Sequence, residues 1–142
     1  MKNIFADTNI LIDLLADRKP FSTFAAGIFD LSRKGKLMIY VSAVSYNNIY
    51  YILRQSLSHI ETIRLLEELS DLVIIADVTK AIIKKSLKTD FKDFEDAIQY
   101  NCALDLPNID AIVTRNTKDF KKSMLPVMSP EEALSTIQIA GG

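Results

Sequence analysis

The chain has few of the residues on which many catalytic and binding motifs depend. Its 142 residues include one cysteine, one histidine, four glycines and no tryptophan. The single Cys102 excludes an internal disulfide framework, and its apolar helical surroundings predict a small buried side chain. His59 is expected at the surface beside a helix cap. With one histidine and one cysteine, a zinc site and a histidine-based nucleophilic mechanism are both disfavoured.

Glycine-rich motifs are absent as well. The sequence has no G-x-G-x-x-G after its first apolar run, no G-x-x-x-x-G-K-[ST] loop and no G-x-S-x-G elbow. The net charge of −1 gives no overall basic field that would attract nucleic acid. Apolar runs stay far below the ~20 residues of a membrane span, and Asp7 and Asp13 interrupt the first one. We therefore expect a cytoplasmic protein with no membrane contact.

The sequence does contain short apolar runs separated by helical patterns. Runs at residues 4–6, 37–41, 72–76 and 111–113 lack alternation and predict parallel strands buried on both faces, with 127–128 as a short edge strand. Helical spacing and capping residues predict helices at 21–31, 49–53, 58–69, 79–83 and 92–104, and from residue 129. We expect one α/β domain over residues 1–140. Its architecture is a three-layer α/β/α sandwich with a mostly parallel central sheet of four to five strands.

Several acidic and amide residues follow the predicted strands. Asp7, Asn116 and Asp119 all come after strand ends, and in open α/β sheets ligands collect outside the carboxyl ends of the strands. Asp110 precedes its strand and therefore belongs at the opposite edge. Taken singly, Asp7 and Asp93 are each better explained as ordinary helix caps than as site residues.

The helix that follows residue 92 adds further acids. Asp93 and Asp96 are three positions apart and share one helix face, whereas Glu95 is expected to point into solvent. Carboxylates gathered at one edge repel each other, and a hard divalent cation such as Mg²⁺ or Mn²⁺ relieves that repulsion without histidine or cysteine ligands. The joint pattern favours a metal site formed by Asp7, Asp93, Asp96, Asn116 and Asp119.

Four segments, in this order and at these separations, resemble the PIN domain: IFADTNILIDLL, VSAVSYNNIYYIL, DFEDAIQY and IDAIVTRNTKDF. The resemblance covers nearly the whole chain and is greatest to small bacterial proteins of the VapC-like toxin type. It implies a metal-dependent ribonuclease in which a central parallel sheet brings acidic residues together at its carboxyl edge.

The resemblance also assigns roles residue by residue. Asp7 matches the acid that ends the first strand, and Asp96 matches the acid of the later helix, with Asp93 as a frequent companion. Asn116 and Asp119 are joint candidates for the last acidic position. The positions that resemble supporting residues of the family are Thr8, Asn9, Ser42, Asn48 and Thr114.

One of these positions departs from the family pattern. The family usually has a glutamate on the helix after the second strand, and the matching residue here is Asn48. Asn48 borders the apolar stripe of its helix and can face the sheet edge, but it supplies no charge. The substitution predicts weaker metal binding. A catalytically weak PIN-like module that binds RNA or a protein partner is therefore the alternative function.

The main hypothesis is an endoribonuclease that hydrolyses single-stranded RNA with Mg²⁺ or Mn²⁺ held by Asp7, Asp96 and Asp119. Arg115 and Lys118, beside the last motif, are expected to contact RNA phosphates. The toxin resemblance further implies a cognate antitoxin and a homodimer. A third hypothesis is a phosphotransfer α/β domain, which also places an aspartate after its first strand.

Overall fold

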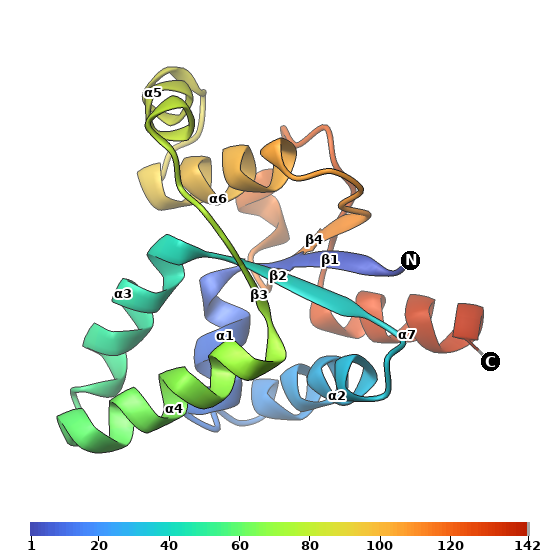
Figure 1. Ribbon diagram of the computed structural model, residues 1–142. Coiled ribbons are helices and arrows are strands. Elements are labelled where there is room, and N and C mark those ends of the chain that lie inside the picture. Colours follow the sequence, from blue (N-terminus) through green and yellow to red (C-terminus); the bar gives the residue numbers. More distant parts are fainter. Residues whose placement is uncertain (142) are drawn as a thin grey trace.

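A computed structural model describes residues 1–141 and has a five-stranded sheet at its centre (Figure 1). The strand order is β3-β2-β1-β4-β5, and every neighbouring pair of strands is parallel. The strands are β1 (Asn3–Ala6), β2 (Met38–Ser42), β3 (Ile74–Ala76), β4 (Ala111–Val113) and β5 (Val127–Met128). The predicted parallel sheet is confirmed, including the short fifth strand.

Helices cover both faces of this sheet, as the three-layer prediction requires. In Figure 1, α5 and α6 lie over one face, whereas α1, α2, α4 and α7 lie over the other. The helices are α1 (Thr8–Leu15), α2 (Phe21–Arg33), α3 (Ala43–Leu53), α4 (His59–Leu72), α5 (Lys80–Lys88), α6 (Phe94–Asp105) and α7 (Pro130–Gly141), with a short 3-10 helix η1 (Thr117–Phe120). Over residues 1–141, none of the helices combines the length and the apolar character needed to cross a membrane.

Local signals begin and end several helices where the sequence predicts them. Ser58 begins α4 by accepting a hydrogen bond from the backbone N–H of Glu61 at 3.2 Å, and its hydroxyl donates to the Glu61 carboxylate at 3.0 Å. Thr79 begins α5 by accepting from the N–H of Ile82 at 3.2 Å. Gly35, just after α2, has a φ of +74°, a left-handed conformation that glycine adopts without strain.

The third strand differs from its prediction. Helix α4 continues to Leu72, so β3 is limited to Ile74–Ala76 instead of residues 72–76. Ile74 and Ile75 are 38% and 43% exposed because β3 lies at the edge of the sheet. The prediction that this strand is buried on both faces is therefore wrong. An apolar run predicts a strand, but it does not tell whether the strand has neighbours on both sides.

The strand order reverses beside β1, and this reversal creates a crevice at the carboxyl edge of the sheet. The chain adds β2 and β3 on one side of β1 and then crosses to its other side to form β4. The backbone N–H of Asp7 donates to the carbonyl of Val113 at 3.0 Å, which holds the ends of β1 and β4 together. In open α/β sheets such a reversal is the usual place for a ligand.

An ion pair fastens α1 to the segment that follows β4. Asp13 is 1% exposed, and its carboxylate oxygens accept hydrogen bonds from the Arg115 guanidinium at 2.5 and 3.1 Å. The guanidinium carbon also lies 4.0 Å from the ring centroid of Phe21. Without Arg115, Asp13 would be a buried charge with no ionic partner, so this pair stabilises the fold beside the crevice.

Replacing Arg115 with alanine is expected to lower the free energy of unfolding by about 3–5 kcal/mol, because the buried Asp13 loses its partner. The matched control is Arg33→Ala, which breaks the exposed Asp30–Arg33 pair and should cost no more than about 1 kcal/mol. Urea unfolding of both variants and the wild type measures the two costs. Equal costs would contradict a structural role for the Asp13–Arg115 pair.

Candidate metal and nucleic-acid site

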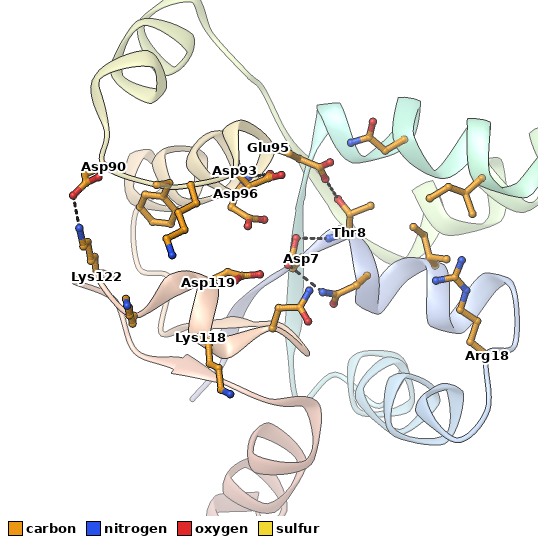
Figure 2. Close-up of a pocket in the computed structure, with 18 residues that line it drawn as sticks. Asp7, Thr8, Arg18, Asp90, Asp93, Glu95, Asp96, Lys118, Asp119 and Lys122 are labelled. Carbon is orange, nitrogen blue, oxygen red and sulfur yellow. Dashed lines mark hydrogen bonds and ion pairs between the residues drawn. The ribbon is translucent and has the colours of Figure 1, made fainter.

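A cavity of about 600 Å³ opens at the carboxyl edge of the sheet and is called the acidic pocket below. Figure 2 shows acidic side chains from distant parts of the chain around this cavity. Its acidic residues are Asp7, Asp90, Asp93, Glu95, Asp96 and Asp119, and its amide residues are Asn9, Asn48 and Asn116. The structure thus brings together every residue of the predicted metal site.

Asp7 is both a helix cap and a wall of the acidic pocket. Its Oδ1 accepts from the backbone N–H of Thr8 at 2.8 Å, which begins α1. Its Oδ2 accepts from Thr114 Oγ1 at 2.8 Å and from Asn9 Nδ2 at 3.3 Å. The sequence leaves a cap and a site residue as alternatives, and the structure shows one carboxylate in both positions.

Burial and neighbouring charge act on Asp7 in the same direction. Burial is the main cause that raises the pKa of Asp7 from 3.8 to about 6. The hydrogen bonds from Thr114 and Thr8 lower this pKa, whereas the charges of Glu95 and Asp119 raise it further. The hydrogen bonds therefore stabilise the carboxylate without fully offsetting its burial.

The first turn of α6 supplies the acids that face Asp7. Asp93 caps this helix by accepting from the backbone N–H of Asp96 at 3.0 Å. Burial, and then the charges of Asp7, Asp93, Asp119 and Glu95, raise the pKa of Asp96 from 3.8 to about 7. A helix N-terminus favours negative charge, so burial and repulsion outweigh the helix dipole at this position.

The predicted supporting residues fall into two groups. Those lining the acidic pocket are Thr8, Asn9 and Asn48. Ser42 and Thr114 are fully buried and do not line it. Thr114 orients Asp7, as described, and its Oγ1 also accepts from the backbone N–H of Asn116 at 3.1 Å. Ser42 caps α3 by accepting from a backbone N–H at 3.1 Å, so its role is in the helix and not in the pocket.

The two predicted phosphate contacts lie in different places. Lys118 lines the acidic pocket, but Arg115 does not, because its guanidinium is engaged by Asp13 and Phe21. This placement gives Arg115 a structural role and does not support the predicted phosphate contact. The cationic residues that line the pocket are Arg18, Lys92, Lys118, Lys121 and Lys122. Arg18 carries no sequence signal, since it lies in a loop far from the acidic motifs.

Glu95 also differs from its prediction. It does not point away into solvent, because its Oε2 accepts from Thr8 Oγ1 at 2.9 Å at the wall of the acidic pocket (Figure 2). The same Thr8 oxygen contacts Ser45 Oγ at 2.7 Å and Gln99 Nε2 at 3.0 Å. The available signal is the spacing of four between Glu95 and Gln99, which puts a buried amide on the same helix face as the acid.

Comparison with known proteins decides the family. The model of the PIN domain matches residues 3–118. The chain belongs to the PIN domain family. It is also 23% identical over 139 residues to Ribonuclease VapC1 of Aquifex aeolicus (strain VF5), with 92% of each chain covered. This membership favours the ribonuclease and the PIN-like module over the phosphotransfer domain.

Several solved structures similar to this PIN domain come from toxin–antitoxin systems. VapBC-1 from nontypeable Haemophilus influenzae has a TM-score of 0.67 and 21% identity, covering 91% of this chain and 98% of that one. A toxin–antitoxin complex from Klebsiella pneumoniae has a TM-score of 0.64 and 23% identity, covering 89% of this chain and 97% of that one. VapC20 of Mycobacterium tuberculosis, a sarcin-ricin loop cleaving toxin, has a TM-score of 0.61 and 17% identity. The match covers 77% of this chain and 86% of that one. At these identities the likeness shows a shared fold.

The donor chemistry of the acidic pocket fits the divalent metal on which PIN-domain ribonucleases generally depend. The pocket offers carboxylate and amide oxygens and contains neither histidine nor cysteine, a set that hard cations prefer. In their present rotamers, no three acidic, histidine or cysteine side chains within residues 1–137 are gathered closely enough to hold an ion. To bind such a cation, the more exposed carboxylates, such as Asp119, would have to turn towards Asp7.

The raised pKa of Asp96 predicts how the stability of the metal-free PIN domain depends on pH. Because the folded state holds this proton up to about pH 7 and the unfolded state releases it near 3.8, acidification favours folding. An Asp96→Asn variant should unfold at a higher temperature than the wild type at about pH 8, and the difference should shrink towards about pH 5.5.

Thermal unfolding in EDTA checks this expectation. The control is Asp105→Asn, at the exposed end of the same helix. Its unfolding temperature should not rise above that of the wild type at about pH 8 and converge with it towards about pH 5.5. A difference between wild type and Asp96→Asn that is the same at every pH would contradict the role of Asp96 charge in the metal-free pocket.

Proposed function

We propose that this PIN domain is an endoribonuclease that hydrolyses single-stranded RNA with Mg²⁺ or Mn²⁺. The observation that carries the proposal is the meeting of Asp7, Asp96 and Asp119 in one pocket at the strand-order reversal. Burial, with repulsion among the acids as a further cause, raises the pKa of Asp7 and of Asp96, and a bound divalent cation would stabilise both carboxylates. The similarity to Ribonuclease VapC1 supports the same class of reaction.

The pocket residues have separable tasks in this reaction. Asp7, fixed by three hydrogen bonds, would anchor the cation, with Asp96 and Asp119 as further ligands. Asn116 and Asp93, which line the same pocket, would assist. When bound, the cation supplies a water molecule of lowered pKa and neutralises charge on the scissile phosphate. A pocket carboxylate not engaged with the cation would accept the proton of that water.

The cations around the acidic pocket suit a polyanionic substrate. Carboxylates alone repel RNA, whereas lysine and arginine side chains at the rim attract the phosphates on either side of the bond to be cut. Lys118 and Lys121 line the pocket beside Asp119. Lys122 pairs with Asp90, but both side chains are more than half exposed, so a phosphate can replace this weakly held partner.

The shape of the site favours a single strand over a duplex. A flexible strand can bend one phosphate into a cavity of about 600 Å³. The backbone of an A-form duplex is stiff and keeps its phosphates on the outside of a wide cylinder. We therefore infer that unpaired segments of RNA are the preferred substrate.

We further infer that the chain is the cytoplasmic toxin of a toxin–antitoxin pair and forms a homodimer. The support for an antitoxin partner comes from the fold shared with VapBC-1 of Haemophilus influenzae and the toxin–antitoxin complex from Klebsiella pneumoniae. Tyr51 is 65% exposed and packs edge-on against Tyr50, which offers an aromatic surface on α3 for a protein partner.

The position of Asn48 supports the alternative function, a catalytically weak PIN-like module. Asn48 lines the acidic pocket, so the neutral side chain does stand where it can affect a bound cation. A PIN-like module that binds RNA or protein but cuts slowly is the function expected if the remaining acids do not offset this lost charge.

Replacing Asp7 with asparagine is expected to reduce RNA cleavage at least about a hundredfold, because the amide keeps the size of the side chain but removes the anchoring charge. The assay measures cleavage of a labelled single-stranded RNA with Mn²⁺ or Mg²⁺, with EDTA added in parallel. Asp105→Asn should cleave as the wild type does. Cleavage that survives both EDTA and Asp7→Asn would contradict a metal-dependent site, whereas metal binding without any cleavage would favour the PIN-like module.

Replacing Lys118 or Lys121 with alanine is expected to weaken RNA binding and to reduce the slope of log affinity against log salt by about one per lysine. Binding is measured in the Asp7→Asn background so that the RNA stays intact. Lys84→Ala on α5, which does not line the pocket, is the matched control. A salt slope equal to that of the control would exclude these lysines from phosphate contact.

A further inference from the structure

The hydroxyl of Thr8 on α1 holds the carboxylate of Glu95 at the acidic pocket, and Ser45 on α3 in turn contacts Thr8. Glu95 Oε2 accepts from Thr8 Oγ1 at 2.9 Å, and Thr8 Oγ1 lies 2.7 Å from Ser45 Oγ. Gln99 Nε2 donates to both hydroxyl oxygens at 3.0 Å. Figure 2 shows Glu95 reaching from the start of α6 to Thr8 on α1. The network therefore joins α1, α3 and α6 at one point.

The hydrogen atoms of this network can be assigned from its chemistry. Thr8 has one hydroxyl hydrogen, and an ionised Glu95 can only accept it. Thr8 must then accept the hydrogen of Ser45, while Gln99 gives one amide hydrogen to each hydroxyl. The series of donors ends on the Glu95 carboxylate, and hydrogen bonds to a charged acceptor are the stronger kind.

The orientation of Gln99 indicates that its amide group serves this network as a hydrogen-bond donor to the two hydroxyls. Gln99 is fully buried, and its Oε1 has no hydrogen-bond partner among the side chains of residues 1–137 or the backbone of residues 1–141. Leaving a buried carbonyl oxygen unpaired carries a cost in stability. The side chain carries that cost while both hydrogens of its amide are directed at the hydroxyls of Thr8 and Ser45.

Helix α3 offers no charged side chain on this side of the acidic pocket. Asn48 comes three positions after Ser45 and shares its face of α3, so it lines the pocket as a neutral amide. Glu95 brings a negative charge to Thr8, which also contacts Ser45. That charge acts on the predicted metal ligands, because it is among the causes that raise the pKa of both Asp7 and Asp96.

We propose that Glu95 is a carboxylate ligand of the divalent cation in this PIN domain and supplies the negative charge that Asn48 lacks. This inference rests on the metal-dependent function proposed above. Thr8 is a positioning residue, because it holds the Glu95 carboxylate in the pocket before a cation binds, and Ser45 supports Thr8 in this role. The charge of the metal site is thus carried by α6 instead of α3.

Glu95→Gln tests the ligand role, because the amide keeps an oxygen that can accept from Thr8 but removes the charge. Mn²⁺ affinity, measured by calorimetry, should fall about tenfold or more. The unfolding temperature in EDTA should stay the same or rise, because repulsion of Asp7 and Asp96 is reduced. Glu67→Gln, on the exposed side of α4, should change neither quantity. A lower unfolding temperature with unchanged Mn²⁺ affinity would show that Glu95 is only structural.

Thr8→Val tests the positioning role, because valine keeps the shape of threonine without its hydroxyl. Mn²⁺ affinity should again fall about tenfold. The double variant of Thr8→Val and Glu95→Gln should bind Mn²⁺ no more weakly than Glu95→Gln alone, since Thr8 acts through Glu95. Two losses that add in full would overturn this positioning role.

The failure of this inference can be told apart from the failure of the proposed function. If the wild type binds Mn²⁺, Asp7→Asn does not, and Glu95→Gln binds as tightly as the wild type, Glu95 is not a ligand and the metal-dependent function stands. If the wild type binds no Mn²⁺ and cleaves no RNA, the proposed function is wrong and the inference about Glu95 is overturned with it.

Discussion

The rest of the acidic pocket depends on one buried charge, the carboxylate of Asp7 at the point where the sheet reverses its strand order. Burial disfavours that charge and raises the pKa of Asp7 to about 6, and the hydrogen bonds from Thr114 and Thr8 offset only part of this effect. The surrounding acids add to the cost. A group of carboxylates that destabilise one another in this way is typical of functional sites, because stability alone gives no reason to keep them together.

Much of this arrangement could be predicted because it follows from local rules. Parallel strands end at the same edge of a sheet, so Asp7 and Asp119 could be placed together from the positions of apolar runs. The acids of α6 could be added because residues three apart share a helix face. Caps such as Ser58 depend on neighbours within one turn, and the sequence contains both partners of the capping interaction.

Two side chains near the site lie in unexpected places because their partners are far away in the sequence. Arg115 stands beside the last motif, yet it turns to Asp13, because that buried acid requires a cation. Glu95 was expected in solvent, but Thr8 on α1 holds it at the pocket, on the face of α6 that also carries the buried Gln99. The periodicity of one helix does not give the position of another helix. The partners of these side chains could therefore not be predicted from the sequence.

The strand order also decides when during synthesis the pocket can exist. Asp7 belongs to the first strand made, but the hydroxyl that fixes it belongs to Thr114, 107 positions later. Until β4 is inserted beside β1, Asp7 lacks the hydrogen bond from Thr114 and the crevice has only one wall. A nascent chain therefore passes most of its length through the ribosome before it has a site.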